Sequence, residues 1–400
     1  GLYSGEEFLS GDVLVNFDWN AFYRFCKRQT LVGVVFEGIQ RLPKETAPDQ
    51  DLLMTWFGQS QRIHKRNILM NEATAQIYNK IRAEGFRCCI LKGQGNALMY
   101  PNPESRTPGD VDVWVNASRE EIRRLAKRLV SDDSTIGEES LNHIEMTLNG
   151  IAVELHSSPA ILNNPLYNHR LQKWLGRNID LQCSNIVSLP DETGNIAVPT
   201  CAFNLIYQLF HLYHHYFYEG VGLRQIVDYY FVIDKWHTDL TDSTDISRRM
   251  DNRYHTDLVS PSTADLQFTD SELNSKKQYA VRKAKSVESV RSVCEKELKC
   301  LGLWKFAGAV MYVLHEVLGL SEDRMIRPMD VKRGRMLLEE ILYGGNFGQH
   351  DERYGFGHGA LGHNLQRLYR DLRLVRYYPA EALSEPIFRI WHFFWRKFHQ

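Results

Sequence analysis

Residues 109–115 of the chain read Gly-Asp-Val-Asp-Val-Trp-Val. The alternating apolar residues of this stretch predict a strand, because successive side chains on a strand point to opposite faces. Asp110 and Asp112 are then expected to project from one face, opposite the valines. Two carboxylates in this arrangement can share divalent cations, and oxygen ligands suit Mg²⁺ or Mn²⁺. We therefore expect a metal site at this strand.

A second predicted strand, residues 86–91, precedes a glycine-rich turn that reads Lys92-Gly93-Gln94-Gly95. A strand followed by a glycine turn and a helix commonly holds phosphate. Lys92, Gly93 and Gln94 are therefore candidate nucleotide-binding residues. Arg106 precedes Asp110 by four residues, close enough for its guanidinium to reach a phosphate near the metals. Replacing Arg106 with Ala should then damage turnover more than folding.

Residues 142–156 predict a β-hairpin, because Asn149-Gly150 suits a type I′ turn between two alternating runs. A two-residue turn fixes the register of the two strands. It places Glu145 opposite Glu154 and His143 opposite His156, all on one face.

Facing carboxylates such as Glu145 and Glu154 repel each other unless a cation, a shared proton or open water separates them. We expect Glu154 to be the third metal-binding carboxylate, with an ordinary solvent-facing position as the alternative. His143 and Glu145 are second-rank candidates, for which the solvent-facing position is the simpler reading. His156 is also second-rank, either orienting a metal-binding carboxylate or packing in the core.

Several of these segments resemble an uncharacterised nucleotidyltransferase family of the polymerase-beta-type superfamily. The family carries an L-K-G…R…D-I-D-L-L-V signature, which is similar to Leu91-Lys92-Gly93, Arg106 and residues 109–115. Its E-L-H element resembles Glu154-Leu155-His156, and its downstream helical region resembles residues 223–228, which end at Asp228. The similarity spans most of the chain.

The resemblance implies an α+β fold, in which a small mixed sheet of the nucleotidyltransferase type is flanked by N-terminal helices and a large C-terminal helical domain. The spacing of apolar residues and the Pro-containing breaks predict helices on both sides of the sheet. The expected regions are residues 6–84, an N-terminal helical region; 85–198, the nucleotidyltransferase core; and 199–400, the C-terminal helical domain.

Three segments of the C-terminal region have unusual composition. Residues 239–299 are polar and predict a solvated loop or insertion before a charged helix. The glycine-rich residues 344–362 predict a loop or lid. Aromatic residues at helical spacing in 387–399 predict a helix docked on the core, with an interfacial membrane helix as the alternative.

The resemblance also implies a reaction, the transfer of a nucleoside monophosphate from a nucleoside triphosphate to a hydroxyl group, with ATP favoured. Asp110 and Asp112 would be metal ligands and Glu154 the third acidic residue, holding two Mg²⁺ or Mn²⁺ ions. Gln94 stands where the superfamily usually has a serine, so the usual hydroxyl contact to the triphosphate is missing. Two rival functions stay open: a metal-dependent phosphohydrolase, and a non-catalytic nucleotide-binding or interaction module.

The charge balance bears on the acceptor. The 48 basic and 49 acidic residues nearly cancel, which argues against a nucleic acid and favours a small molecule, with a protein hydroxyl also possible. On the expected helix near residue 211, His211, His214 and His215 lie among aromatic residues. They predict core or acceptor-pocket histidines rather than a zinc site, so His214 is a second-rank candidate. Asp228 is another, with a structural or an acceptor-positioning role.

The sequence also indicates a compartment. Its seven cysteines are odd in number and contain no C-x-x-C pair, which is typical of buried thiols in a reducing environment. Residues 1–7 lack the basic and apolar regions of a signal peptide. The most apolar stretch, residues 303–320, is interrupted by charged side chains, so we expect no transmembrane segment and a cytoplasmic location.

Overall fold

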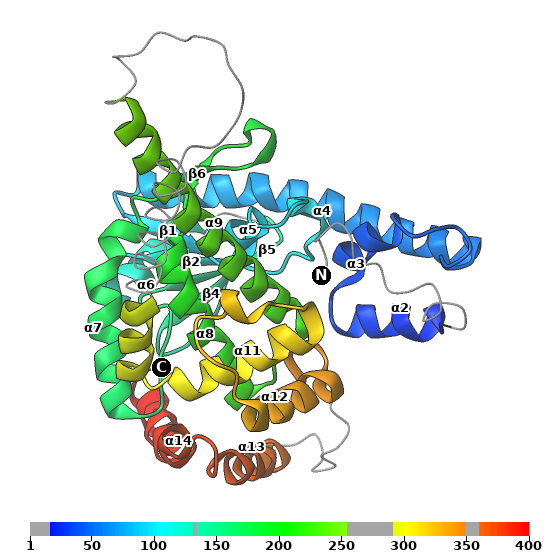
Figure 1. Cartoon of the computed structure of the whole chain (residues 1–400). Coiled ribbons are helices and arrows are strands. Elements are labelled where there is room, and N and C mark those ends of the chain that lie inside the picture. Colours follow the sequence, from blue (N-terminus) through cyan, green and yellow to red (C-terminus); the bar gives the residue numbers. More distant parts are fainter. Residues whose placement is uncertain (1–16, 131–133, 254–290, 349–359, 400) are drawn as a thin grey trace.

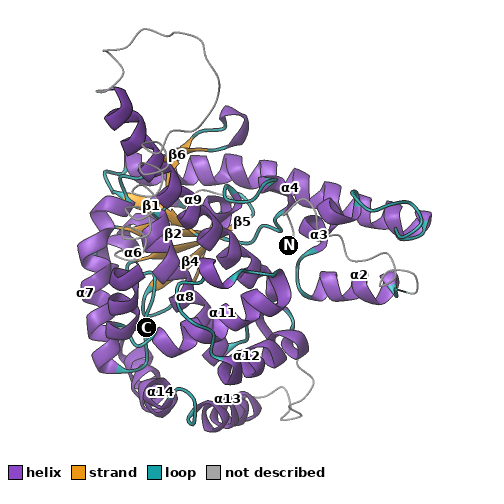
Figure 2. Cartoon of the chain, in the orientation of Figure 1, coloured by secondary structure: helices purple, strands orange, loops and turns teal. Residues whose placement is uncertain are grey.

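The computed structural model of the chain describes residues 17–130, 134–253, 291–348 and 360–399. It has the expected α+β architecture, with a small sheet enclosed by helices (Figures 1 and 2). Long helices from the N-terminal part of the chain lie on one side of the sheet, and the helices after residue 200 gather on the other (Figure 1).

The main sheet has five strands in the order β1-β2-β5-β4-β3 and is mixed, because β2 and β5 run parallel while the other neighbours run antiparallel. Its strands are β1 (Cys88–Leu91), β2 (Val111–Val115), β3 (Thr135–Glu139), β4 (His143–Leu148) and β5 (Ile151–His156). A separate two-stranded sheet contains β6 (Ile186–Ser188) and β7 (Asn195–Ala197). We did not predict the edge strand β3, because its largely exposed residues show no apolar alternation.

Helices precede, separate and follow the strands of the sheet. The helices before residue 200 are α2 (Trp19–Arg28), α3 (Val32–Ile39), α4 (Gln50–Ala83), α5 (Gly93–Ala97), α6 (Arg119–Leu129) and α7 (Pro165–Gln182). Those after it are α8 (Cys201–Tyr218), α9 (Leu223–Arg253), α11 (Trp304–Leu318), α12 (Val331–Gly344), α13 (Ala360–Leu374) and α14 (Pro379–His399). Short 3₁₀ turns occur at η1 (Pro103–Ser105), η2 (Pro190–Glu192), η3 (Glu322–Arg324) and η4 (Asn346–Gly348).

Strand β2 is buried on both faces, and its two faces belong to different hydrophobic clusters. The three valines pack with residues of α4 and α6 in one hydrophobic cluster. Trp114 belongs to the opposite cluster and stacks on Phe203 of α8, with ring centroids 5.7 Å apart. Asp112 is two residues from Trp114, so alternation directs its carboxylate toward the same side, where the C-terminal helices lie.

The hairpin register predicted from Asn149-Gly150 is confirmed. Both turn residues have positive φ, and Leu148 pairs with Ile151. The pairs further along the hairpin are Glu145 with Glu154 and His143 with His156.

The polar segment 239–299, predicted to contain a solvated loop or insertion, begins as a helix, because α9 continues to Arg253. Lys235 and Asp239 pair at 2.7 Å with helical spacing, so polar residues support the helix here rather than ending it. Residues 254–290 lie outside the described residues, and the expected charged helix is present at 291–300. Most of the glycine-rich segment, residues 349–359, also lies outside the described residues.

The C-terminal helix α14 packs on the rest of the protein through its first half and through Trp395, while much of the apolar surface between them is exposed. Ala382 and Glu385 are buried, whereas Ile387 and Phe394 are 72% and 53% exposed. The guanidinium carbon of Arg119, in α6, lies 4.2 Å from the centroid of a Trp395 ring. The predicted docking of the aromatic segment is therefore wrong for most of its apolar face, which solvent reaches.

Within the described residues no helix has both the length and the apolar character that a membrane crossing requires. All seven cysteines are free thiols. Five are buried, Cys201 is partly buried and Cys300 is exposed, so the expectation of buried thiols is wrong for Cys300.

Candidate active site

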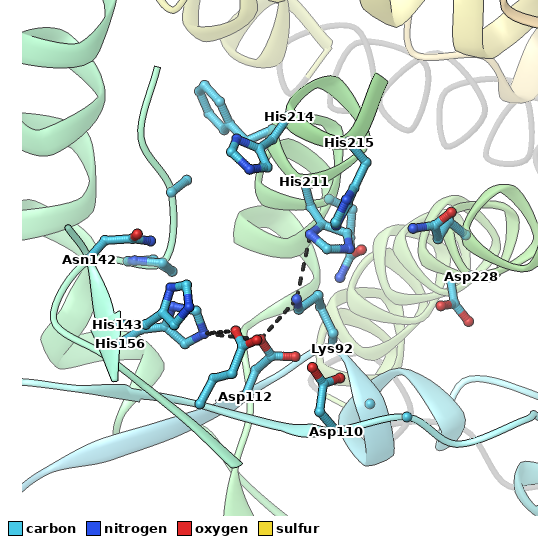
Figure 3. A pocket seen from close by; sticks show the side chains of 18 of the residues that line it. Lys92, Asp110, Asp112, Asn142, His143, His156, His211, His214, His215 and Asp228 are labelled. Carbon is cyan, nitrogen blue, oxygen red and sulfur yellow. Dashed lines mark hydrogen bonds and ion pairs between the residues drawn. The ribbon is translucent and has the colours of Figure 1, made fainter. Parts of the chain in front are cut away.

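Three carboxylates meet where β2 and β5 run side by side. Asp112 and Glu154 are register partners in this parallel pair, and Asp110 lies just before β2. One carboxylate oxygen from each residue lies within 4.8 Å of the other two. The structure therefore brings together the three residues that the sequence marked as metal ligands. Asp110 and Asp112 lie opposite the helix that carries His211, His214 and His215 (Figure 3).

Two basic side chains contact the buried carboxylate of Asp112. Lys92 Nζ lies 3.0 Å from Asp112 Oδ1, and His156 Nε2 lies 3.0 Å from the same oxygen. His156 Nε2 also lies 3.1 Å from Glu154 Oε2, so this imidazole bridges two of the three carboxylates. Lys92 comes from the turn after β1, where it has the unusual φ of 49°. Strained backbone of this kind is concentrated at functional sites.

The ionisation of the cluster follows from these contacts. Burial alone would raise the pKa of Asp112, but Lys92 and His156 together hold it well below its usual range. Burial opposes protonation of His156, yet its hydrogen bonds to Asp112 and Glu154 raise its pKa to about 9. The hydrogen bond from His156 in turn lowers the pKa of Glu154 against the effect of burial. At neutral pH the cluster thus contains two cations and at least two carboxylates.

Asp110 differs from the other two carboxylates. The residue is exposed at the mouth of the site. The neighbouring charge of Asp112 raises the pKa of its carboxyl group, and desolvation of that group by nearby protein atoms adds to this effect. Such repulsion is relieved when a cation binds between the two groups. The donor set of three carboxylates within 4.8 Å therefore fits a hard divalent cation.

A cavity of about 290 Å³ opens in front of the carboxylates. One wall is the sheet, with Lys92 and the three acidic residues, and the opposite wall is α8, with His211, His214 and His215 (Figure 3). Lys92 Nζ lies 3.5 Å from His211 Nδ1 and links the two walls. Burial and the Lys92 charge lower the pKa of His211, and burial with His215 lowers that of His214 to about 3. These imidazoles are neutral and can accept or donate one hydrogen bond at each nitrogen.

The predicted nucleotide-binding residues have different positions. Lys92, Gly93 and Arg106 line the cavity, but the guanidinium of Arg106 is engaged in a buried pair with Asp228. The Gln94 side chain is 4% exposed and donates a hydrogen bond to Asn71 of α4, so it is turned away from the cavity. The glutamine at the usual serine position therefore serves the packing of α5 on α4.

The second-rank residues of the hairpin also line the cavity. His143 is beside His156, with ring centroids 5.1 Å apart, and its Nε2 lies 3.7 Å from Glu145 Oε1. Burial and the neighbouring His156 lower the pKa of His143. The Asn149-Gly150 turn sets the register of β4 and β5, and this register brings these residues together.

Sequence reasoning did not single out several lining residues, among them Asn142, Gln208 and Glu219, and it related Arg224 only to Asp228. Arg224 Nη1 donates to the carbonyl of Thr107 at 3.0 Å, near the loop that leads to Asp110. The sequence predicts that Arg224 lies one helical turn before Asp228, but it does not indicate which loop Arg224 contacts.

Comparison with known proteins gives a match to one family model. A family model described as an uncharacterised nucleotidyltransferase matches residues 16–258, which include every residue of the carboxylate cluster. Among solved structures, that of an antigenic nucleotidyltransferase-like protein from Paracoccidioides brasiliensis shares 18% identity over 55% of this chain and 90% of that chain. Its TM-score of 0.28 is too low to carry an argument. No curated protein matches the chain.

Proposed function

Because the chain belongs to the uncharacterised nucleotidyltransferase family, we propose that it moves a nucleoside monophosphate from a nucleoside triphosphate to an acceptor hydroxyl and releases pyrophosphate. The observation that supports this most directly is the gathering of Asp110, Asp112 and Glu154 within 4.8 Å beside Lys92 at one cavity. The same three carboxylates would hold Mg²⁺ or Mn²⁺, in the proposal two ions. Bound there, the metal would neutralise triphosphate charge and favour departure of pyrophosphate.

The chain's own residues have distinct roles in this proposal. Lys92 supplies a cation at the cavity wall for the phosphates, and it holds Asp112 ionised. His156 fixes the orientation of Asp112 and Glu154 by donating to both. Arg106 acts indirectly, because its pair with Asp228 fixes the loop that carries Asp110.

The acceptor would approach from the side of α8. The neutral imidazoles of His211 and His214 can hydrogen-bond to a hydroxyl without repelling or attracting a charge. Together with a formal net charge of −1, this favours a small polar molecule or a protein hydroxyl over a nucleic acid. ATP is the favoured nucleotide. The free thiols suit a cytoplasmic setting.

Calorimetric titration tests the nucleotide site. ATP, GTP, CTP and UTP are titrated with Mg²⁺ into the wild type, into Asp110→Asn/Asp112→Asn, and into Glu120→Gln, which removes an exposed carboxylate on α6. We expect Mg²⁺-dependent binding of at least one triphosphate to the wild type and Glu120→Gln only. Equal binding to the folded double variant would overturn the proposed site.

Product analysis then separates the possible reactions. Pyrophosphate and a nucleotide-labelled acceptor support transfer. Orthophosphate released from a phosphoester would favour the phosphohydrolase, and binding without turnover across a broad acceptor screen would favour a non-catalytic module.

A further inference from the structure

One face of the β4–β5 hairpin has the pattern His-x-Glu on one strand and Glu-x-His on the other. Cross-strand pairing places His143 against His156 and Glu145 against Glu154. Directly opposed carboxylates are unfavourable on a strand pair, whereas opposed imidazoles beside carboxylates are a common ligand set for metals. This face adjoins the Asp110–Asp112 pair, because Glu154 belongs to both groups and His156 Nε2 also lies 3.0 Å from Asp112 Oδ1.

Three of these side chains have potential ligand atoms close together. One atom each from His143, Glu154 and His156 lies within 4.8 Å of the other two. Glu145 is nearby, with Oε1 3.7 Å from His143 Nε2. Ligands bound to tetrahedral Zn²⁺ at about 2.0–2.1 Å lie roughly 3.3 Å apart, so modest side-chain rotation would complete such a site.

The two histidines also have the environment that a metal ligand needs. His143 Nδ1 lies 3.0 Å from Ser140 Oγ, which fixes the ring and leaves Nε2 to face Glu145. The His156 side chain is 7% exposed, and its Nδ1 has no hydrogen-bond partner within the part of the chain that the structure describes. A metal bound at His156 Nε2 would replace the proton that this nitrogen shares with Asp112 and Glu154, because imidazole binds metals in its neutral form.

We propose that His143, Glu154 and His156 form a binding site for a divalent transition-metal ion such as Zn²⁺, additional to the carboxylate site for Mg²⁺. Imidazole ligands favour ions such as Zn²⁺, whereas sites built only from carboxylates suit Mg²⁺ or Mn²⁺. The two sites share Glu154. The histidines of one site should select a transition-metal ion, and the aspartates of the other should select Mg²⁺. Binding at the histidine site does not require the proposed transfer reaction.

Cobalt spectroscopy tests the site directly. The whole protein is stripped of metal with a chelator and titrated with Co²⁺ in excess Mg²⁺, which occupies the carboxylate site. We expect one equivalent of Co²⁺ to bind with the visible absorption of a nitrogen-ligated ion. Stoichiometric Zn²⁺ should displace it, and further Mg²⁺ should not.

Variants assign the ligands. His143→Asn should weaken Co²⁺ binding by more than the ~10- to 100-fold typical of losing an outer hydrogen-bond partner. His169→Asn, which removes an exposed histidine on α7, should leave the titration unchanged. Asp110→Asn should keep the Co²⁺ absorption even where it abolishes nucleotide binding, which separates failure of this site from failure of the proposed function.

Unchanged Co²⁺ affinity in folded His143→Asn would overturn the proposal, as would displacement of Co²⁺ by Mg²⁺. Should His143→Asn not fold, Ser140→Ala provides the test, because it removes only the hydrogen bond to His143 Nδ1. We expect Ser140→Ala to weaken Co²⁺ binding about 10-fold. An unaltered titration for that variant would count against His143 as a ligand.

Discussion

Arg106 and Asp228 form a bidentate ion pair across 122 residues of sequence, with Nε 2.7 Å from Oδ1 and Nη2 2.8 Å from Oδ2. Their side chains are only 4% and 6% exposed. Tyr100 Oη donates to the same carboxylate at 2.5 Å. This buried pair connects the loop before Asp110 to α9 and so fixes one edge of the candidate site.

The Arg106–Asp228 pair leads to a prediction about stability. Arg106→Ala leaves Asp228 as an uncompensated buried charge, and Asp228→Ala does the same to Arg106. Each should lower the free energy of unfolding by about 3–5 kcal/mol, measured by urea denaturation. The double variant should lose less free energy of unfolding than the two single variants lose together, because neither partner of the pair remains as an unpaired charge.

This expectation differs from the one drawn from sequence, in which Arg106 mainly served turnover. Normal stability of Arg106→Ala together with lost turnover would restore the phosphate-binding role. Tyr100→Phe is the mild control, since it removes a single hydrogen bond worth about 1 kcal/mol.

Lys92 gives a prediction about the ligand. Lys92→Met keeps the length of the side chain but removes its charge from the cavity wall. A charge-assisted hydrogen bond contributes about 1.5–3 kcal/mol, so the Kd for the triphosphate should rise by roughly 10-fold or more. Calorimetry measures this, with Lys80→Met, an exposed lysine of α4, as the matched control. Equal affinities of wild type and Lys92→Met would exclude Lys92 from phosphate binding.

Local rules were sufficient for part of the site. The Asn149-Gly150 turn fixed the pairing of Glu145 with Glu154, because a two-residue loop allows one register. Strand alternation placed Asp112 on the face opposite the valines. Both predictions depend only on residues close together in sequence.

Contacts between distant segments were beyond these rules. Lys92 meets His211 across 119 residues, and Arg106 meets Asp228 across 122. Neither pair follows from periodicity, since each depends on how α8 and α9 pack over the sheet. The orientation of Gln94 was missed for the same reason, because its partner Asn71 belongs to α4.

Close packing of α3 against η1 gives a paired prediction with glycines. A Cβ on Gly33 would lie 2.3 Å from the carbonyl oxygen of Ser105, next to Arg106, whereas a Cβ on Gly38 of the same helix would meet nothing within 4 Å. Gly33→Ala should therefore cost about 1–3 kcal/mol of stability. Gly38→Ala should be neutral or stabilise by up to about 1 kcal/mol, because Ala favours helix. Thermal and urea unfolding compare the two, and equal effects would show that α3 can shift away from η1.

Glu381 provides a pH-dependent element that does not belong to the carboxylate cluster. Its carboxylate on α14 accepts hydrogen bonds from the backbone N–H of Asn163 at 2.6 Å and of Asn164 at 3.3 Å, just before α7. Burial nevertheless dominates and raises the pKa of Glu381 from 4.5 to about 7. The folded protein therefore binds this proton more tightly than the unfolded chain does.

The stability contributed by protonated Glu381 should be fully present below pH 4.5 and should be lost as pH rises through about 7. The pKa difference corresponds to a loss of about 3 kcal/mol across that range. Glu381→Gln cannot titrate, so the free energy of unfolding of the wild type minus that of the variant should fall by this amount between pH 4.5 and 8. Urea denaturation at several pH values measures the difference, with Glu339→Gln on exposed α12 surface as the control. Parallel pH profiles for wild type and Glu381→Gln would contradict this prediction. They would mean that the Glu381 carboxyl group has the same pKa in the folded and the unfolded chain.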